Sequence, residues 1–261
     1  MEHQDNIKKV PERSNDIECP IKIGIDGLDC IIEGLKPGEL TVVSSMPNYL
    51  SRVFIIKLAT NVGVRNKIPM AYFSLELSSL QIVNRLIVNF TGMSREDLSR
   101  LTKDEFDKLV MPFSESPMYI DDTVSIPMAD METRIRRYSR EYGVKLVIID
   151  YLQLMDEVTG VRSECRQQAI NNIISSLKRL AKELNLHIVV RNQLIKLTNN
   201  PDGLRWFCTF ISFLGPNSVL FKEADNILTL FEERNTNEVF AGLWSSDQDD
   251  IATIKLDLKI D

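Results

Sequence analysis

The sequence has few of the residues from which metal sites and disulfide frameworks are built. Its 261 residues include only four cysteines and two histidines, namely Cys19, Cys30, Cys165, Cys208, His3 and His187. No two cysteines stand at the spacing of metal ligands, which argues against a zinc site. Scattered cysteines in a chain of this size are typical of reduced thiols in a cytosolic protein.

The sequence also lacks a long apolar run and an excess of positive charge. No apolar stretch approaches the length that spans a bilayer, and the polar N-terminus has no signal-peptide core, so we expect a cytoplasmic protein. The chain has 31 basic and 37 acidic residues, a formal net charge of −6. Proteins that bind nucleic acid through their own electrostatic field are usually basic, so this balance argues against autonomous DNA binding.

Along the chain, β-rich segments alternate with segments of helical periodicity. We predict strands at 39–44, 70–74, 118–120, 145–150, 187–190, 224–231 and 251–260, the last two near one edge of a sheet. We predict helices at 51–64, 78–90, 129–142 and 163–184, with two small surface helices within 94–113. This alternation indicates βαβ units, and hence an α/β fold with a mostly parallel twisted sheet, helices on both faces and ligands at the carboxyl ends of the strands.

The polar first segment differs in composition from the remainder. Residues 1–18 are charged and polar, and we predict a flexible arm there. Residues 19–261 are long enough for one large α/β domain with a full core, and we expect a single domain.

Five segments resemble one family in the same order and spacing, from about Ile23 to Leu258. They are IGIDGLDCIIEGLKPGEL, FSLELSSLQIVNRL, PMYIDDT, LVIIDYLQLM and RQQAINNIISSLKRLAKELN. The chain is thereby similar to the C-terminal RecA-like ATPase domain of DnaB-family replicative DNA helicases. The fourth segment resembles the family's Walker B strand almost letter for letter.

The resemblance assigns roles to three polar residues. In an active member, Asp150 would help to hold Mg²⁺, Glu76 would activate the attacking water, and Gln193 would be a polar sensor at the end of the next strand. All three residues are present. From the sequence alone, Asp150 could equally cap a turn and Glu76 could be a surface charge.

The phosphate-binding loop departs from the family pattern. A P-loop has the form G-x-x-x-x-G-K-[ST], with glycines for backbone wrapping, a lysine for the phosphates and a hydroxyl for Mg²⁺. In register, Leu50 replaces the second glycine, Ser51 the lysine and Arg52 the hydroxyl residue. We therefore expect no bound cofactor, although Arg52 retains a cation near a helix start.

The position that would contact the nucleotide of a neighbouring subunit is also altered. The resemblance places a Lys-x-Arg pair of the family within GLWSSDQDD, where Ser245 and Asp247 stand instead. A trans arginine contributes on the order of 10³–10⁵ in rate to related phosphoryl transfer. These losses together predict little or no ATP hydrolysis.

The segment that would line a DNA channel has changed as well. The family's loop corresponds to LGPNSVLFKEAD, where Gly215 and Pro216 replace an Arg-Glu pair. The preceding stretch is aromatic, so Trp206 could stack on bases, with Lys196 and Arg205 as the nearby backbone-binding charges. The other interpretation, which we favour, is that these aromatic residues pack in a core or a protein interface.

The resemblance also bears on assembly. The family's N-terminal collar domain and linker helix, which ties the hexamer together, have no counterpart in this sequence, and this argues against a stable homohexamer. The basic helix with Arg134, Arg136, Arg137 and Arg140 is a candidate contact surface, or simply a solvated helix face.

Three functions remain open at this point. The first is a catalytically inactive partner or regulator of a replicative helicase, or of another replication protein, acting in DNA replication. The second is an ATP-dependent replicative helicase with an atypical nucleotide site, which alone would require ATP and Mg²⁺. The third is a nucleic-acid-binding module, with single-stranded DNA as a ligand, that retains only the fold.

Overall fold

The computed structural model describes residues 19–25, 27–45, 49–155, 166–193, 218–233, 238–246, 250–256 and 258. The predicted flexible arm, residues 1–18, lies outside these ranges. Among the residues described, no helix combines the length and the apolar character needed to traverse a lipid bilayer.

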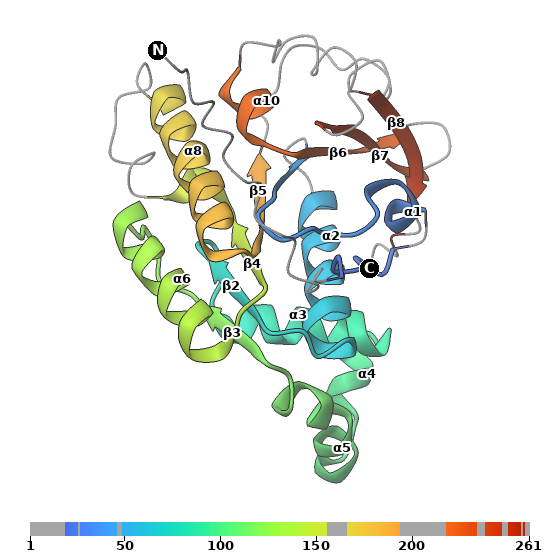
Figure 1. Ribbon diagram of the computed structural model, residues 1–261. Helices are drawn as coiled ribbons and strands as arrows, with labels where there is room; N and C mark the ends of the chain where they lie inside the picture. Colours follow the sequence, from blue (N-terminus) through green and yellow to red (C-terminus); the bar gives the residue numbers. More distant parts are fainter. Residues whose placement is uncertain are drawn as a thin grey trace, which may run out of the picture.

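Eight strands form one sheet in the order β3-β2-β4-β5-β1-β6-β7-β8 (Figure 1). Their bounds are β1 Leu40–Ser45, β2 Met70–Ser74, β3 Met118–Asp121, β4 Leu146–Asp150, β5 His187–Gln193, β6 Asn226–Glu233, β7 Glu238–Ser245 and β8 Asp250–Leu256. The first six strands in this order, β3, β2, β4, β5, β1 and β6, are parallel to one another. Strand β7 pairs antiparallel with both β6 and β8. The predicted α/β class with a mostly parallel sheet is confirmed.

The antiparallel edge of the sheet differs from our expectation. From the sequence, we predict no strand at Glu238–Ser245. It forms β7, and its residues Val239, Ala241 and Leu243 are buried in the core. Because β7 and β8 lie outside it, β6 is the third strand from the edge.

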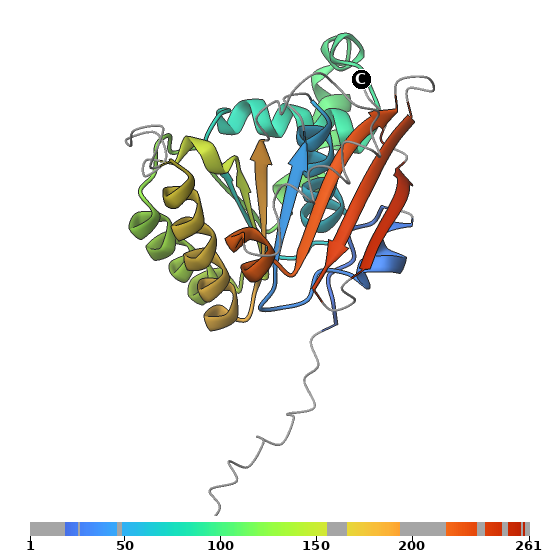
Figure 2. The same ribbon diagram turned by 90° about the horizontal axis from the view of Figure 1, so that it is seen from above.

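Helices cover both faces of the sheet (Figure 2). The helical elements are α1 Leu28–Ile32, α2 Leu50–Ala59, the π-helical turn η1 Thr60–Arg65, α3 Ser79–Thr91, α4 Arg95–Ser99, α5 Lys103–Ser114, α6 Met128–Tyr142, the 3₁₀ turn η2 Leu152–Leu154, α8 Arg166–Leu184 and α10 Val219–Glu223. Helices α6 and α8 pack on one face, with α10 against α8, whereas α1, α2 and α3 lie on the other. The helix predicted for 51–64 therefore begins one residue earlier and ends in a π-helical turn.

Local sequence signals account for the start and end of α3, the helix that follows β2. Ser78 accepts a hydrogen bond from the backbone of Gln81, and the Gln81 side chain accepts from the backbone of Ser78, which completes a capping box. This reciprocal pair satisfies two backbone donors that a helix start leaves free. At the other end Gly92 adopts a left-handed conformation with φ 67°, where a side chain would be strained.

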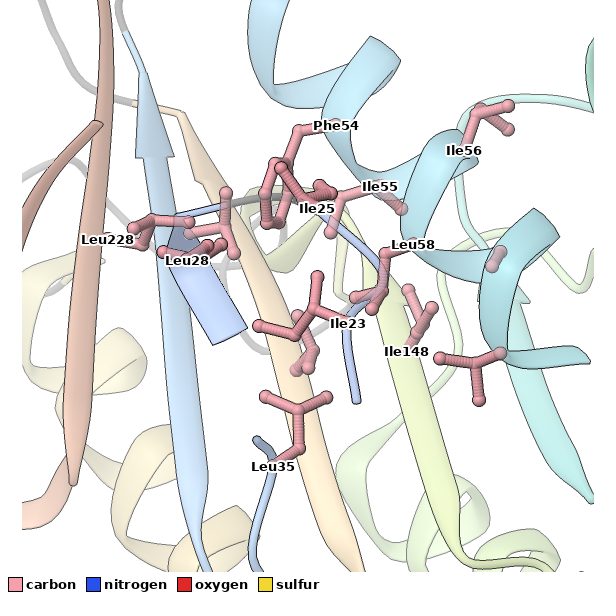
Figure 3. Packing of buried hydrophobic residues seen from close by; sticks show 14 of the residues in the cluster. Ile23, Ile25, Leu28, Leu35, Phe54, Ile55, Ile56, Leu58, Ile148 and Leu228 are labelled. Atoms are coloured by element: carbon pink, nitrogen blue, oxygen red, sulfur yellow. The ribbon is translucent and has the colours of Figure 1, made fainter. Parts of the chain in front are cut away.

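The core beneath α2 fixes the position of that helix relative to the strands. Phe54, Ile55 and Leu58 point toward Ile148 of β4 and Leu228 of β6, and the N-terminal segment packs around them (Figure 3). Burying a side chain of this size contributes about 1.5–3 kcal/mol. Because α2 follows β1 directly, this packing holds the first turn of α2 at the carboxyl end of the central strands.

Candidate functional site

Two acidic residues predicted from the sequence lie at neighbouring strand ends. Asp150 is the last residue of β4, and Glu76 follows β2, whose Ser74 is in register with Asp150. Gln193 ends β5, the next strand of the sheet, where its backbone N–H and C=O both bond to the side chain of Gln153. The structure thus places all three residues at the carboxyl ends of three neighbouring parallel strands, β2, β4 and β5.

A residue that sequence reasoning missed connects the two carboxylates. Arg191 lies on β5 with a side chain that is 5% exposed. Its Nε lies 2.8 Å from Oδ1 of Asp150, and its Nη2 donates to Oε2 of Glu76 at 3.3 Å. Its guanidinium also lies 4.6 Å from the ring centroid of Tyr151. The available signal was a charged residue directly after the apolar stretch Ile188–Val190.

Asp150 is buried and has a second partner on the opposite side. The Tyr72 hydroxyl donates to Oδ2 of Asp150 at 2.6 Å, and the Asp150 side chain is 2% exposed. Burial raises the pKa of Asp150, although the charge of Arg191 opposes this shift. Burial and the Asp150 charge likewise raise the pKa of Tyr72. The pair is therefore a structural unit in which the tyrosine keeps its proton.

Arg52 occupies the place where the resemblance puts a hydroxyl residue. Its Nη2 donates to both carboxylate oxygens of Glu76 at 2.7 Å. Its neighbours in sequence face inward: Leu50 is fully buried in the core beneath α2, and the Ser51 hydroxyl accepts from the Ser45 hydroxyl at 2.7 Å. Hence, of the three altered loop positions, only Arg52 takes part in the cluster of charged residues.

The charged groups of this cluster are close together but incompletely hydrogen-bonded. Within the described part of the chain, Nε of Arg52, Nε and Nη1 of Arg191 and Oδ1 of Asp150 are buried without a hydrogen-bond partner. The 2.8 Å contact between Arg191 and Asp150 is therefore an ion pair whose atoms are not aligned as a hydrogen bond. Unpaired buried polar atoms are destabilising, so this cluster is held in place by the surrounding packing.

The other predicted site residues fall mainly in segments 194–217 and 247–249. Lys196, Arg205, Trp206, Asp247, Gly215 and Pro216 lie outside the described residues. Ser245 is described, at the end of β7 opposite Asn226. Val219 starts helix α10 and packs against the core on the α8 side of the sheet.

The arginines of α6 are largely engaged within the protein. Arg134 pairs with Asp121 at 2.6 Å, Arg136 pairs with Glu183, and the guanidinium of Arg137 lies over the ring of Tyr138. Among the described residues, no group of three or more His, Cys, Asp or Glu side chains could hold a metal ion.

Comparison with known proteins identifies the family. The family model described as "DnaB-like helicase C terminal domain" matches residues 20–239. The chain belongs to this family. The match begins one residue before Ile21, whose backbone bonds to that of Leu35, and it extends into β7. It therefore includes every strand of the parallel part of the sheet.

Two of the relatives in the comparison are bacterial proteins named as replicative DNA helicases. The chain is 30% identical over 239 residues to the replicative DNA helicase DnaB of Geobacillus stearothermophilus, covering 90% of this chain and 52% of the relative. It is 32% identical over 234 residues to the replicative DNA helicase DnaC of Bacillus subtilis, covering 88% and 50%. The chain thus spans about half the length of these relatives.

Solved structures confirm the predicted RecA-like fold. One solved ATPase domain superposes with a TM-score of 0.74 at 22% identity, covering 92% of this chain and 89% of that domain. A DnaB-like replicative helicase, described with its interactions with primase, superposes with a TM-score of 0.72 at 22% identity, covering 90% of this chain and 59% of that one. At 22% sequence identity, this structural similarity shows that the fold is shared and shows nothing further.

Proposed function

We propose that this DnaB-like domain is catalytically inactive and acts in DNA replication as a partner or regulator of a replicative helicase. The observation that carries the proposal is the engagement of both inherited carboxylates by arginines of the same chain. Arg52 holds Glu76 through both oxygens, and Arg191 lies against Asp150 and Glu76.

These contacts oppose the roles that an active site would need. A glutamate that activates water must have a free oxygen, but Glu76 is hydrogen-bonded by Arg52 through both. An aspartate that holds Mg²⁺ must have accessible oxygens, but the Asp150 side chain is 2% exposed, Tyr72 donates to one of its oxygens and Arg191 lies against the other. Two guanidinium groups also repel a divalent cation at the same place.

The residues therefore do not fit a magnesium ion bridged to a triphosphate. Leu50 is buried in the core where a glycine would allow the backbone to approach phosphate, and Ser51 offers no cation. To admit the ion, Arg52 and Arg191 would have to leave their carboxylates, and for the buried Asp150 that would leave an uncompensated charge. This misfit between the residues and a magnesium–triphosphate complex supports a domain that binds a partner protein rather than one that hydrolyses ATP.

The family membership supports a replication partner. The chain has the scaffold of a replicative helicase domain across all parallel strands, and its relatives are named replicative helicases. A domain with this scaffold presents surfaces similar in shape to those of a helicase subunit, and these surfaces supply the contact that we propose. Another replication protein, such as a primase, is the second class of partner.

A second candidate is an ATP-dependent helicase with an atypical site. The observation in its favour is the retention of Glu76, Asp150 and Gln193 at three adjacent strand ends. In that case Arg52 would move from Glu76 to a phosphate when nucleotide binds, since arginine pairs readily with either anion.

An ATPase assay on the full chain separates these candidates. We expect no Mg²⁺-dependent phosphate release above that of buffer, and no difference between the unmodified chain and Glu76→Gln or Asp150→Asn. Phosphate release that disappears in Glu76→Gln would refute the proposed inactivity, because only a working general base is sensitive to that change.

A binding experiment tests the partner role. The full chain is mixed with the intact replicative helicase from the same organism, and complex formation and unwinding of a forked duplex are both measured. We expect a stable complex at micromolar concentration and a changed unwinding rate. If neither the helicase nor the primase of that organism forms a complex, the partner role is rejected.

A further inference from the structure

A cleft opens beside the candidate site, between α2, α3 and α4. It has a volume of about 570 Å³ and is lined, among others, by Tyr49, Arg52, Val53, Arg85, Val88 and Arg95. This volume lies within the range of about 300–1,000 Å³ typical of pockets for small ligands. Glu76 and Asp150, the inherited carboxylates, are not among its lining residues.

Three arginines line this cleft, and among the described residues only Arg52 has a carboxylate partner. Arg52 pairs with Glu76, whereas Arg85 and Arg95 form no ion pair with any residue in the described ranges. Burial lowers the pKa of Arg85, and the neighbouring charges of Arg52 and Arg95 lower it further. One acidic residue, Glu96, also lines the cleft. The positive charges here are therefore close enough to repel one another and are incompletely compensated.

An anion is the ligand that relieves this repulsion. Guanidinium groups match the geometry of phosphate oxygens and form charge-assisted hydrogen bonds with them. Arg85 and Arg95 also line an adjoining hollow of about 430 Å³, so both side chains border open space on more than one side. A phosphate placed between them would gain two such partners without displacing Arg52 from Glu76.

The rest of the cleft is suited to the remainder of a small molecule. Val53, Ile56 and Val88 form an apolar wall, and Tyr49, a residue that is 42% exposed, lines the same cleft. The Tyr49 hydroxyl donates to Oε2 of Glu232 on β6 at 3.4 Å, which helps to orient the ring. A planar or apolar group attached to the phosphate could pack against this wall and ring.

We propose that the cleft between α2, α3 and α4 binds a phosphorylated small molecule, with its phosphate on Arg85 and Arg95 and its remaining part against Tyr49 and Val53. This binding uses neither Asp150 nor a divalent cation. It is therefore independent of the carboxylate cluster and of the proposed lack of ATPase activity.

Calorimetry with two probes tests the proposal on the full chain in the presence of EDTA. Pyrophosphate carries the phosphate alone, and ADP adds a planar group and a sugar. We expect both to bind without Mg²⁺, and we expect ADP to bind more tightly because of the apolar wall. Arg95→Gln and Arg85→Gln should each weaken binding by about tenfold to a hundredfold, the usual effect of losing one charge-assisted hydrogen bond.

A nearby arginine provides the matched control. Arg100 caps α4, its side chain is 78% exposed, and it does not line the cleft. Arg100→Gln removes the same charge from the same short helix and should leave both affinities unchanged. Tyr49→Phe keeps the ring but loses its bond to Glu232, so it should weaken ADP binding less than Tyr49→Ala does, and neither variant should weaken binding of pyrophosphate.

Three results of the titrations in EDTA would overturn the proposal. The first is that neither probe binds, and the second is that binding is equally strong in Arg85→Gln and Arg95→Gln. The third is tighter binding of a single-stranded oligonucleotide that lacks terminal phosphates, lost in the same variants, which would assign the cleft to nucleic acid. A second titration is made with Mg²⁺ in place of EDTA. Binding that appears only in this second titration and is lost in Asp150→Asn would overturn the proposal for the cleft and would also contradict the proposed function.

Discussion

Charged side chains lie at both the amino and the carboxyl ends of the central parallel strands, but the amino-end groups are more completely hydrogen-bonded than the carboxyl-end groups. At the amino ends, Lys178 of α8 donates to both oxygens of Asp225 and to the Gly38 carbonyl. Asp225 in turn accepts from the backbone N–H of Leu40 at 2.7 Å. This set ties the start of β1 to α8 and to the start of β6.

A buried histidine completes the amino-end set. Nδ1 of His187 lies 2.8 Å from the Lys36 carbonyl, and its Nε2 lies 2.9 Å from the Thr41 hydroxyl. Since a carbonyl only accepts, Nδ1 carries the proton and Nε2 accepts from Thr41. The neutral ring therefore has a partner at each nitrogen.

The carboxyl-end set is less well satisfied. The side chains of Arg191 and Asp150 are more buried than those of Lys178 and Asp225, but several of their polar atoms have no hydrogen-bond partner among the described residues. Buried ion pairs with incomplete hydrogen bonding stabilise a fold weakly, whereas complete ones also fix its geometry. The amino-end charges therefore serve the fold, while the carboxyl-end charges contribute little to it beyond neutralising one another.

Removal of Arg191 should produce the largest effect. Arg191→Met leaves the charge of Asp150 buried without its cation, and we expect a loss of about 3–5 kcal/mol in the free energy of unfolding. The double variant Arg191→Met with Asp150→Asn should recover most of this loss. Urea denaturation provides the measurement, and equal stabilities of the single and double variants would contradict the explanation.

Acidification should act mainly on the amino end. Burial lowers the pKa of His187 from 6.5 to about 4, so the stability it contributes is fully present above 6.5 and is lost as the pH falls toward 4. The difference corresponds to about 3 kcal/mol. Urea midpoints measured from pH 7 to pH 4 should show this loss, and His187→Gln should lack it.

Asp150 should respond to pH in the opposite sense. Its pKa is raised above 3.8 in the folded protein, so its contribution is fully present below 3.8 and is lost as the pH rises through the folded value. Asp150→Asn should remove this dependence while keeping an acceptor for the Tyr72 hydroxyl. If the difference in stability between the variant and the unmodified chain is constant above pH 4, this interpretation of Asp150 is wrong.

The smallest effect is expected for Arg52. Its side chain is 25% exposed and that of Glu76 is 34% exposed, so solvent screens their attraction. We expect Arg52→Ser to lower the free energy of unfolding by about 1 kcal/mol or less. Arg65→Ser, at the other end of the same helical segment, is a suitable comparison. If Arg52→Ser instead lowers the free energy of unfolding as much as Arg191→Met does, Arg52 and Arg191 act as one unit.

Much of the parallel sheet was predictable from local sequence. The stretch Lys145–Asp150 has four consecutive apolar residues and a terminal carboxylate, and it forms β4 almost as predicted. The helix that follows β2 has its capping residues in sequence at Ser78 and Gln81. Such elements depend on short-range periodicity and capping, which a single sequence contains.

The contacts of the site were less predictable because they are distant in sequence. The resemblance identified Glu76 and Asp150, but Arg191 lies 115 residues from Glu76 and was missed. Nothing in the spacing of these residues indicates that an arginine of β5 points between two carboxylates that follow β2 and end β4. Likewise, the strand β7 was missed because its only indication was a short apolar run.

The order of strands in the sheet also has a consequence for synthesis of the chain. Strand β1 lies between β5 and β6, so both of its neighbours are made late. Strand β1 ends at Ser45, whereas β5 begins only at His187. At about 5–20 residues per second, strand β1 is made on the order of ten seconds before its first neighbour exists. Strand β1 therefore has neither of its neighbours in the sheet while residues 46–186 are made, and the sheet closes around it only when β5 and β6 arrive.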